Sequence, residues 1–264
     1  MVSLKSILPV VITDRAQTIF ERNLSWAPKV HSTRAMAFVI KGLYYYNRSS
    51  KVETTVPTVD LLSSRLVQMY RHESTSDWHW FESYLTYANS IMPEALLCAY
   101  AMTGNEVYKD IAKKSFDFLL SKTFTDDAIK VISNKTWHLR GSETHPYGEQ
   151  PIDVAYTVIA LRKFHDIFKE KRYIDKMELA FNWFLGNNHL QQVIYNPCTG
   201  GCYDGLEDKY INLNQGAEST VSYLMARLTM EKHFGGNEKK SIDKKSISRK
   251  SKVKLGVKIE RDTL

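Results

Sequence analysis

A repeat with a period of 65 residues constrains the fold of this chain more than any other feature of its sequence. Gln150 and Asp153 open one apolar helical run, and Gln215 and Glu218 open another at the same spacing. The same offset relates four further pairs: Tyr108 and Tyr173, Phe116 and Phe181, Phe118 and Trp183, and Leu120 and Leu185. A unit of such a repeat cannot bury its apolar face alone, so the period predicts stacked supersecondary units.

Helical periodicity shows what each unit is. Apolar residues recur at spacings of three and four over residues 33–46, 58–70, 94–102, 106–120, 152–168, 172–185 and 215–233, and a further helix is expected near 13–24. Pro57, Pro93 and Pro151 stand where proline fits the first turn of a helix. The chain shows no convincing strand alternation. We therefore expect an all-α fold of about three and a half helical hairpins, with seven or eight helices.

The first helix of each hairpin carries an acid in its opening turn. These acids are Glu94, Asp153 and Glu218. If the first helices run side by side, their acids gather at one end of the bundle. The long loops 74–92, 121–149 and 186–214 each precede a first helix, so they lie at that same end. Loops gathered at one end of a repeat array commonly form the binding site.

Composition and cysteine usage restrict the class of protein. Hydrophobic residues make up 43% and charged residues 25% of the 264 residues, as in globular proteins. Cys98, Cys198 and Cys202 form no disulfide framework in a chain of this length. Cys198 and Cys202 would suit a metal only with further ligands, of which His189 is the nearest, so we expect no metal site. We find neither a signal-peptide pattern nor an apolar stretch of 18 residues, and expect a cytoplasmic protein without a membrane span.

The net charge of +7 is concentrated at one end of the chain. Residues 235–264 hold ten basic and four acidic residues, a net of +6, so the rest of the chain is nearly neutral. Binding of nucleic acid by the folded part is therefore poorly supported. We expect an N-terminal segment at 1–30 with one helix, a helical domain at 31–234 and a basic, disordered tail at 235–264.

Four motifs in order resemble those of a known group of proteins. They are DWHWFE at 77–82, QPIDVAY at 150–156, TGGCYDG at 199–205 and NQGAEST at 214–220. Residues 30 to 234 as a whole resemble bacterial six-hairpin, (α/α)-toroid proteins of the glycosidase-like superfamily, members of which occur beside or fused to glycosyltransferases. The resemblance implies a toroid whose funnel holds a carbohydrate. A complete toroid needs twelve helices, so this chain is expected to form a partial ring.

Glycoside cleavage requires two carboxyl groups, one that donates a proton and one that acts as base or nucleophile. Asp77 and Glu82 stand among aromatic residues, where desolvation would raise the pKa and favour a proton donor. Asp153 and Glu218 are the candidate bases, because a helix N-terminus lowers the pKa of a carboxyl. The alternative is that each repeated acid only caps its helix.

Sugar binding is expected from aromatic, amide and further acidic side chains in the loops. Flat rings cover the apolar face of a sugar while polar groups take its hydroxyls. The expected platform and polar partners are Trp78, His79, Trp80, Glu94, Tyr147, Gln150, Tyr156, Asp204, Asn214 and Gln215.

The sequence thus predicts a carbohydrate-active protein, glycoside hydrolase-like, that acts on an oligosaccharide without a cofactor. The alternative is a non-catalytic module that binds a glycan, associates with a glycosyltransferase or associates with itself. In that case the aromatic residues would matter and the acids would not. A nucleic-acid protein using the tail is a third class, which predicts salt-sensitive binding.

Overall fold

The computed structural model of the chain describes residues 10–50 and 55–234. Its helices in this part of the chain are α1 (Val10–Asn23), α2 (Thr33–Ser50), α3 (Val56–Glu73), α4 (Ile91–Thr103), α5 (Glu106–Thr123), α6 (Pro151–Phe168), α7 (Lys171–Asn182) and α8 (Ala217–Phe234), with short 3-10 turns η1 (Leu24–Lys29) and η3 (Trp183–Leu185). The expected number and order of helices are confirmed.

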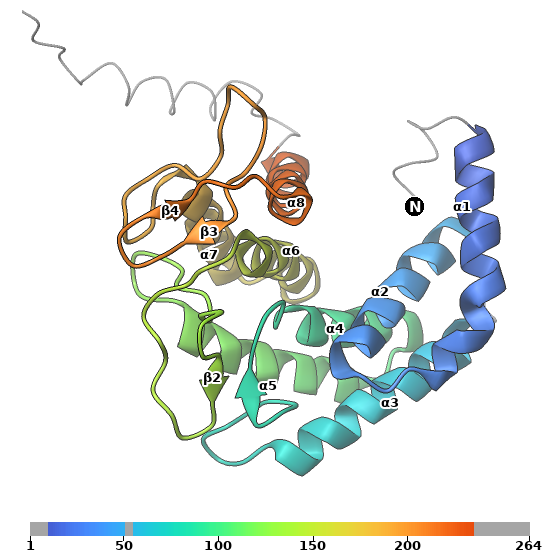
Figure 1. Cartoon of the computed structure of the whole chain (residues 1–264). Helices are drawn as coiled ribbons and strands as arrows, with labels where there is room; N and C mark the ends of the chain where they lie inside the picture. The colour runs from blue at the N-terminus through green and yellow to red at the C-terminus, as the bar shows by residue number, and fades with distance from the viewer. Residues whose placement is uncertain (1–9, 51–54, 235–264) are drawn as a thin grey trace, which may run out of the picture.

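The helices form an arc of two layers (Figure 1). Helices α2, α4, α6 and α8 pack side by side in that order and make the inner layer. Helices α3, α5 and α7 each return from one inner helix and cover the outside. Figure 1 shows the arc open between α8 and α1. This arrangement is a partial (α/α) toroid, as the sequence predicts.

The position of each helix in the arc follows from its apolar pattern. Helix α4 is apolar on all sides, and every residue from Ile91 to Ala99 is buried, as expected of a helix enclosed by neighbours. Helix α7 is amphipathic, and its buried residues Tyr173, Met177 and Phe181 lie on one face. The aromatic pairs of the 65-residue repeat therefore occupy matching buried positions on α5 and on α7 with the following η3. In the remaining, aliphatic pair Leu120 is buried but Leu185 is 44% exposed.

Turn residues fix the ends of the hairpins. Asn105 caps α5, because its side chain accepts a hydrogen bond from the backbone N–H of Val107. Gly104 ends α4 in the left-handed conformation, with a φ of 71°. Lys169 takes the same conformation at the end of α6, so the hairpins α4–α5 and α6–α7 turn in similar ways.

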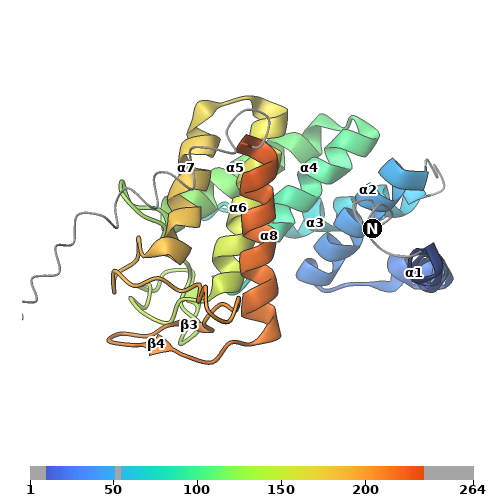
Figure 2. The same cartoon turned by 90° about the horizontal axis from the view of Figure 1, so that it is seen from above.

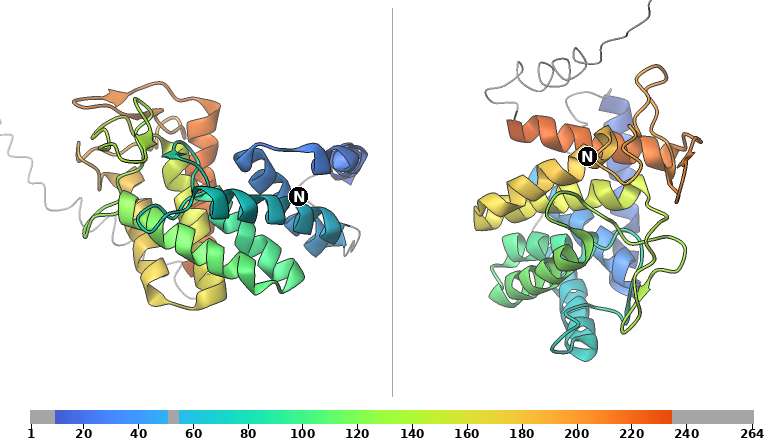
Figure 3. Two further views of the ribbon diagram at one scale, coloured as in Figure 1. Left: turned by 90° about the horizontal axis from the view of Figure 1, so that it is seen from below. Right: turned by 90° about the vertical axis from the view of Figure 1, so that its left-hand side faces the viewer.

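The long loops carry two short two-stranded ladders. Strand β1 (Tyr84–Leu85) pairs with β2 (His138–Leu139), and β3 (Gly205–Leu206) pairs with β4 (Ile211–Asn212), both antiparallel. In Figure 2 the loops of β3 and β4 lie at the end of the molecule where α6 and α8 begin. The two further views of Figure 3 show the same loops gathered beside the start of α8. The expected gathering of loops at the acidic helix starts is therefore present.

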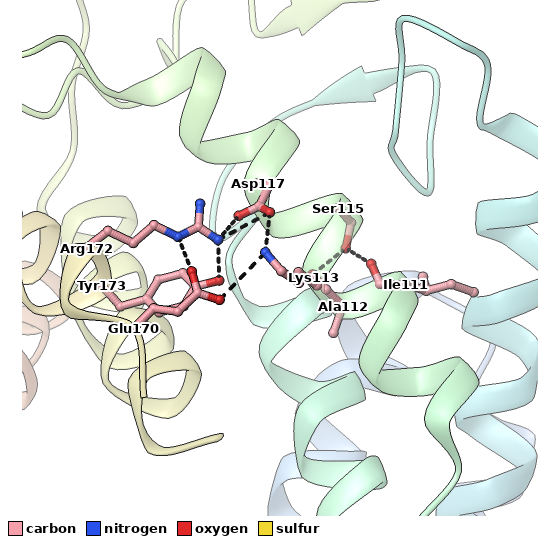
Figure 4. A network of polar contacts seen from close by, with 8 residues as sticks. All are labelled: Ile111, Ala112, Lys113, Ser115, Asp117, Glu170, Arg172 and Tyr173. Atoms are coloured by element: carbon pink, nitrogen blue, oxygen red, sulfur yellow. Dashed lines mark hydrogen bonds and ion pairs between the residues drawn. The ribbon is translucent and has the colours of Figure 1, made fainter. Parts of the chain in front are cut away.

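Charged residues link the outer helices α5 and α7 (Figure 4). Arg172 lies 3.0 Å from Asp117 and 2.5 Å from Glu170. Lys113 lies 2.8 Å from Asp117 and 3.9 Å from Glu170. These side chains are about two fifths exposed, so the network joins the outer layer at its surface, at the start of α7.

Parts of the predicted organisation are not covered by this structure. The basic tail at 235–264 lies outside the described residues, and the division into three segments stays a prediction. Within the described part of the chain, none of the helices is both long enough and apolar enough to cross a membrane. The cytoplasmic location also stays a prediction.

Candidate functional site

A polar pocket of about 290 Å³ lies at the start of α6 and α8. Carboxyl and amide side chains dominate its wall. The lining residues are Asn134, Glu149, Gln150, Asp204, Gly205, Glu207, Asn212, Gly216, Ala217, Glu218 and Ser219. The sequence analysis named Gln150, Asp204 and Glu218 among these, and the structure brings the three together.

The loop before α6 forms one wall of the pocket by pairing with the loop before α8. The backbone N–H of Glu149 donates to Leu206 O at 3.0 Å, and the N–H of Leu206 donates to Glu149 O at 2.9 Å. Gly205 allows this approach, because a Cβ atom there would lie only 2.6 Å from Glu149 O. The motifs at 150–156 and 199–205 are therefore neighbours in space.

Asp204 holds the start of α8 in place. Its Oδ1 accepts hydrogen bonds from the backbone N–H of Gly216 at 2.8 Å and from the Ser219 hydroxyl at 2.7 Å. These contacts satisfy donors that a helix N-terminus leaves unpaired. Asp204 thus caps the helix while it lines the pocket, so the structural and the functional interpretations of this acid both fit.

Asp153 differs from expectation in its ionisation. The sequence analysis expected the helix start to lower its pKa. Instead burial raises the pKa to about 7, although the Ala88 N–H and the charge of Arg34 act in the opposite direction. Its Oδ1 accepts the Ala88 N–H at 2.6 Å inside the core. Desolvation exceeds the helix-end effect because this first turn lies between α4 and α8.

The three acids of the inner helices lie close enough for their charges to act on one another or on a common neighbour. The negative charge of Glu218 contributes to the raised pKa of Asp153. Burial raises the pKa of Tyr156, Lys41 opposes this, and the charges of both Glu94 and Glu218 add to it. The acids therefore do not scatter over opposite exteriors.

The acids Glu94, Asp153 and Glu218 differ in how accessible they are to a ligand. Glu218 is exposed at the pocket. Glu94 is fully buried, and its Oε2 pairs with Lys41 at 2.7 Å. Its Oε1 finds no hydrogen-bond partner among the described residues. Glu218 is thus the repeated acid best placed to meet a substrate.

Asp77 is exposed and lacks the desolvated setting that was expected, whereas Glu82 is largely buried but paired with a cation. Arg34 pairs with Glu82 at 2.8 Å, and the Thr33 hydroxyl donates to the same carboxylate at 2.6 Å. Asp77 is exposed, and the hydroxyl of Thr75 lowers its pKa. The adjacent indoles of Trp78 and Trp80 are buried in the core. The expected rise in pKa is therefore wrong for Asp77.

The aromatic residues of the 77–82 motif pack inside the protein. Trp80 is fully buried and Trp78 is 3% exposed. Trp78 lies 5.0 Å from the ring of Phe118 and donates its indole N–H to Glu82 O at 2.7 Å. His79 lies partly exposed beside Phe118. Neither indole presents a face to a sugar in this conformation, because both rings fill the space under β1 and β2.

The remaining candidates, Tyr147, Tyr156, Asn214 and Gln215, are not among the residues that line the pocket. Tyr147 is half-buried and its ring is 5.1 Å from that of His189. The ring of Tyr156 on α6 lies 5.7 Å from that of Phe38 on α2, so these two inner helices meet through aromatic side chains. Gln215 is exposed and accepts a hydrogen bond from the Thr199 hydroxyl, whereas the exposed Asn214 contributes its backbone oxygen to Asp204 N.

Glu149 is a pocket residue that the sequence offers as a candidate carboxyl but that was not among the predicted site residues. It is 4% exposed, and burial raises the pKa of its carboxyl. The Trp183 indole N–H donates to Oε2 at 2.7 Å, and His189 Nδ1 lies 3.4 Å from Oε1. The sequence signal was its place directly before Gln150 in the motif, but its burial depends on distant residues.

The cysteine pattern does not form a metal site here. Cys198 is exposed and Cys202 is buried. His189 faces Glu149 and Glu207 O. No group of three or more potential metal ligands occurs within the described residues.

Comparisons with solved structures identify the fold. An inactive α-1,6-mannanase variant of Salegentibacter sp. HEL1_6, in complex with α-1,6-mannotriose, matches with a TM-score of 0.58 and 15% identity over 77% of this chain and 56% of that one. The glycoside hydrolase family 76 mannosidase Bt3792 from Bacteroides thetaiotaomicron VPI-5482 matches with a TM-score of 0.56 and 16% identity, over 82% of this chain and 57% of that one. A D-mannose isomerase matches with a TM-score of 0.57 and 16% identity, over 76% of this chain and 56% of that one.

These similarities confirm the six-hairpin, glycosidase-like toroid fold predicted from the sequence. The chain spans little more than half the length of the proteins it matches. No family model matches the sequence, and no curated protein matches it. Since the identities are low and the toroid hosts several reactions, the comparisons establish the fold and leave the activity to the site.

Proposed function

We propose that this chain binds a carbohydrate in the pocket at the start of α6 and α8 and hydrolyses a glycosidic bond there. The observation that carries the proposal is the convergence of Glu149, Asp204 and Glu218 on one pocket, from two loops and one inner helix. Sugar hydroxyls need many hydrogen-bond partners, and this wall offers carboxylates and amides in large excess over apolar groups. The pocket is near the lower end of the size range of small-molecule sites, which suits a single sugar ring.

The carbohydrate class is also supported by the proteins that share the fold. Their names include an α-1,6-mannanase, a mannosidase and a mannose isomerase. The concave side of the arc would extend the site beyond the pocket. Tyr156 and Phe38 lie there with partly exposed rings, which can cover the apolar face of a second sugar unit.

The chemistry requires one carboxyl that accepts a proton from water and one that protonates the leaving oxygen. Glu218 fits the first role, because it is the exposed acid of the pocket and stands at the first turn of an inner helix. Asp153 is buried, and its pKa of about 7 keeps its proton at lower pH, so we assign it no direct part in the chemistry.

The test compares Glu218→Gln with a control on the same helix. Glu231→Gln removes an exposed acid near the other end of α8, where it pairs with Arg227. Wild type and both variants are assayed on manno- and gluco-oligosaccharides. We expect turnover by wild type and by Glu231→Gln, and a loss of about 100-fold or more in kcat for Glu218→Gln. Equal turnover by all three proteins would remove Glu218 from the mechanism.

A glycan-binding module without catalysis is the second candidate. It is favoured by the burial of two of the three repeated acids, Glu94 and Asp153. Isothermal titration with the same oligosaccharides separates the two proposals. Binding without product, unchanged in Glu218→Gln, would favour the module. Association with a glycosyltransferase or with a second copy stays a prediction from the sequence.

A further inference from the structure

Glu149 and His189 form a contact that the assignments above leave unused. They come from different loops, one directly before α6 and one after η3. Glu149 is 4% exposed, whereas the His189 side chain is 25% exposed. The carboxyl is thus enclosed on the protein side, and the imidazole connects it with solvent.

The contacts of the imidazole determine where its proton lies. His189 Nε2 is 2.8 Å from the carbonyl oxygen of Glu207. A carbonyl can only accept, so Nε2 must carry a hydrogen. In neutral His189 the lone pair is then on Nδ1, which lies 3.4 Å from Glu149 Oε1. If Glu149 were ionised as well, its Oε1 and the lone pair of His189 Nδ1 would be two acceptors facing each other, so a proton is expected on one of them.

The other oxygen of Glu149 is already committed. Oε2 accepts the indole N–H of Trp183 at 2.7 Å inside the core. An exchangeable proton is therefore placed on the Oε1 side. The distance of 3.4 Å to Nδ1 exceeds that of a normal hydrogen bond, so this proton remains available to a ligand in the pocket.

Among the described residues, the other charged side chains around the pocket form no direct ion pair with Glu149. Lys130 acts on Glu149 through its charge, as His189 does. Across the pocket, Glu207 is engaged by Lys135 at 2.8 Å. Asp204 is held by Gly216 and Ser219, and Glu218 lies open at the far wall.

We propose that Glu149 is the general acid of the pocket and that His189 and Trp183 are its positioning residues. This inference rests on the proposed function. The Glu149 carboxyl gives its proton to the glycosidic oxygen as the bond to the anomeric carbon breaks and its electron pair goes to that oxygen. Water attacks the anomeric carbon and gives a proton to Glu218. Solvent then restores the proton of Glu149 and removes that of Glu218.

The kinetic test uses the full chain and conservative variants. Glu149→Gln keeps an acceptor for Trp183 but cannot donate an acidic proton. We expect a fall in kcat of about 100-fold or more on oligosaccharides with little change in KM. Activity should recover on glycosyl fluorides, whose leaving group needs no proton. Glu143→Gln, an exposed acid of the same loop, is the control and should behave as wild type. Full activity of Glu149→Gln on oligosaccharides would overturn the inference while the proposed function stands.

His189→Gln tests the positioning role, with His145→Gln as its control. The contact with His189 lowers the pKa of Glu149, so the loss of this contact should move the alkaline limb of kcat/KM to higher pH. His145, in the neighbouring loop, contacts the Tyr147 backbone, and its replacement should leave the limb in place. An unmoved limb in His189→Gln would exclude His189 as a positioning residue.

A readout without turnover separates the two proposals. Carbon-13 NMR of the glutamate carboxyls, assigned with Glu149→Gln, follows the titration of Glu149 directly. We expect a midpoint above that of exposed glutamates, which moves in His189→Gln and not in His145→Gln. If Glu149 titrates in this way but no oligosaccharide is cleaved, the proposed function fails, whereas the interaction between Glu149 and His189 is still supported. If Glu149 titrates as an exposed glutamate does, the inference is overturned whatever the activity.

Discussion

At the scale of single residues, burial decides the properties of the acids more than their neighbours in sequence do. Asp153 illustrates this, because its helix-start position and its enclosure act on the pKa in opposite directions. Its carboxyl accepts one backbone N–H at 2.6 Å, which is less than the two or three such bonds that hold a buried carboxylate ionised. The raised pKa of about 7 has a consequence for stability.

We predict that the Asp153 carboxyl makes the protein less stable as the pH rises. The folded state keeps this proton up to about pH 7, whereas an unfolded chain loses it near pH 3.9. The folded state therefore binds more protons between these values, and the free energy of unfolding falls across that window by about 4 kcal/mol at most. Asp153→Asn should remove this slope in urea unfolding measured from pH 4 to pH 8.

The control for this prediction is Asp110→Asn, an exposed acid on α5. It should keep the wild-type slope. If Asp153→Asn lost stability equally at pH 4 and pH 8, the carboxyl would be ionised throughout and the raised pKa would be contradicted.

Two arginine ion pairs of this protein should differ in their contribution to stability. Arg34 and Glu82 are 10% and 11% exposed, and Arg34 also donates to Tyr87 O and to Asn89. Arg34→Met leaves a buried carboxylate unpaired and should lower the free energy of unfolding by about 3–5 kcal/mol. Arg172→Met, in the exposed network of Figure 4, should cost about 1 kcal/mol or less. Similar costs in urea unfolding would contradict this.

At the scale of elements, the helices were predictable and the loop contacts were not. Periodicity located every described helix, because apolar spacing such as Tyr173, Met177 and Phe181 is local. The four sequence motifs lie largely in the loops. The role of each loop side chain depends on which residues, distant in sequence, it contacts in the folded protein. The sequence predicts that Trp78 and Trp80 form a sugar platform, but both indoles are buried in the core. Glu149 gained its role only through Trp183 and His189.

Gly205 provides a test of the loop pairing that forms the pocket wall. A Cβ atom at this position would lie 2.6 Å from Glu149 O, so Gly205→Ala must displace one of the two loops. We expect a loss of about 1–3 kcal/mol in the free energy of unfolding and a changed titration of Glu149. The control is Gly42→Ala in α2, where a Cβ atom would meet the Phe20 ring at 3.8 Å. There alanine should be neutral or stabilising, because it favours the helix. A stable Gly205→Ala with unchanged Glu149 would contradict the pairing.

At the scale of the whole molecule, the partial ring follows from the number of repeat units. The helix count in the sequence already indicated that the toroid is incomplete, and the matched structures exceed this chain in length. What the count could not indicate is which surface is left open. In the structure it is the outward side of α8, where Val221, Leu224 and Leu228 are 53%, 46% and 53% exposed. These three residues lie on one stripe of the helix.

This open side leads to a prediction that compares two faces of α8. Leu224 lies on the exposed stripe, whereas Met230 is 6% exposed and belongs to the core. Met230→Gln buries an amide in place of an apolar side chain and should lower the free energy of unfolding by about 2 kcal/mol or more. Leu224→Gln should change it by about 0.5 kcal/mol or less, because water already reaches this side chain. Urea unfolding at low protein concentration measures both. A cost for Leu224→Gln that matches that of Met230→Gln would mean that the outward face of α8 is covered in solution, which contradicts an open arc.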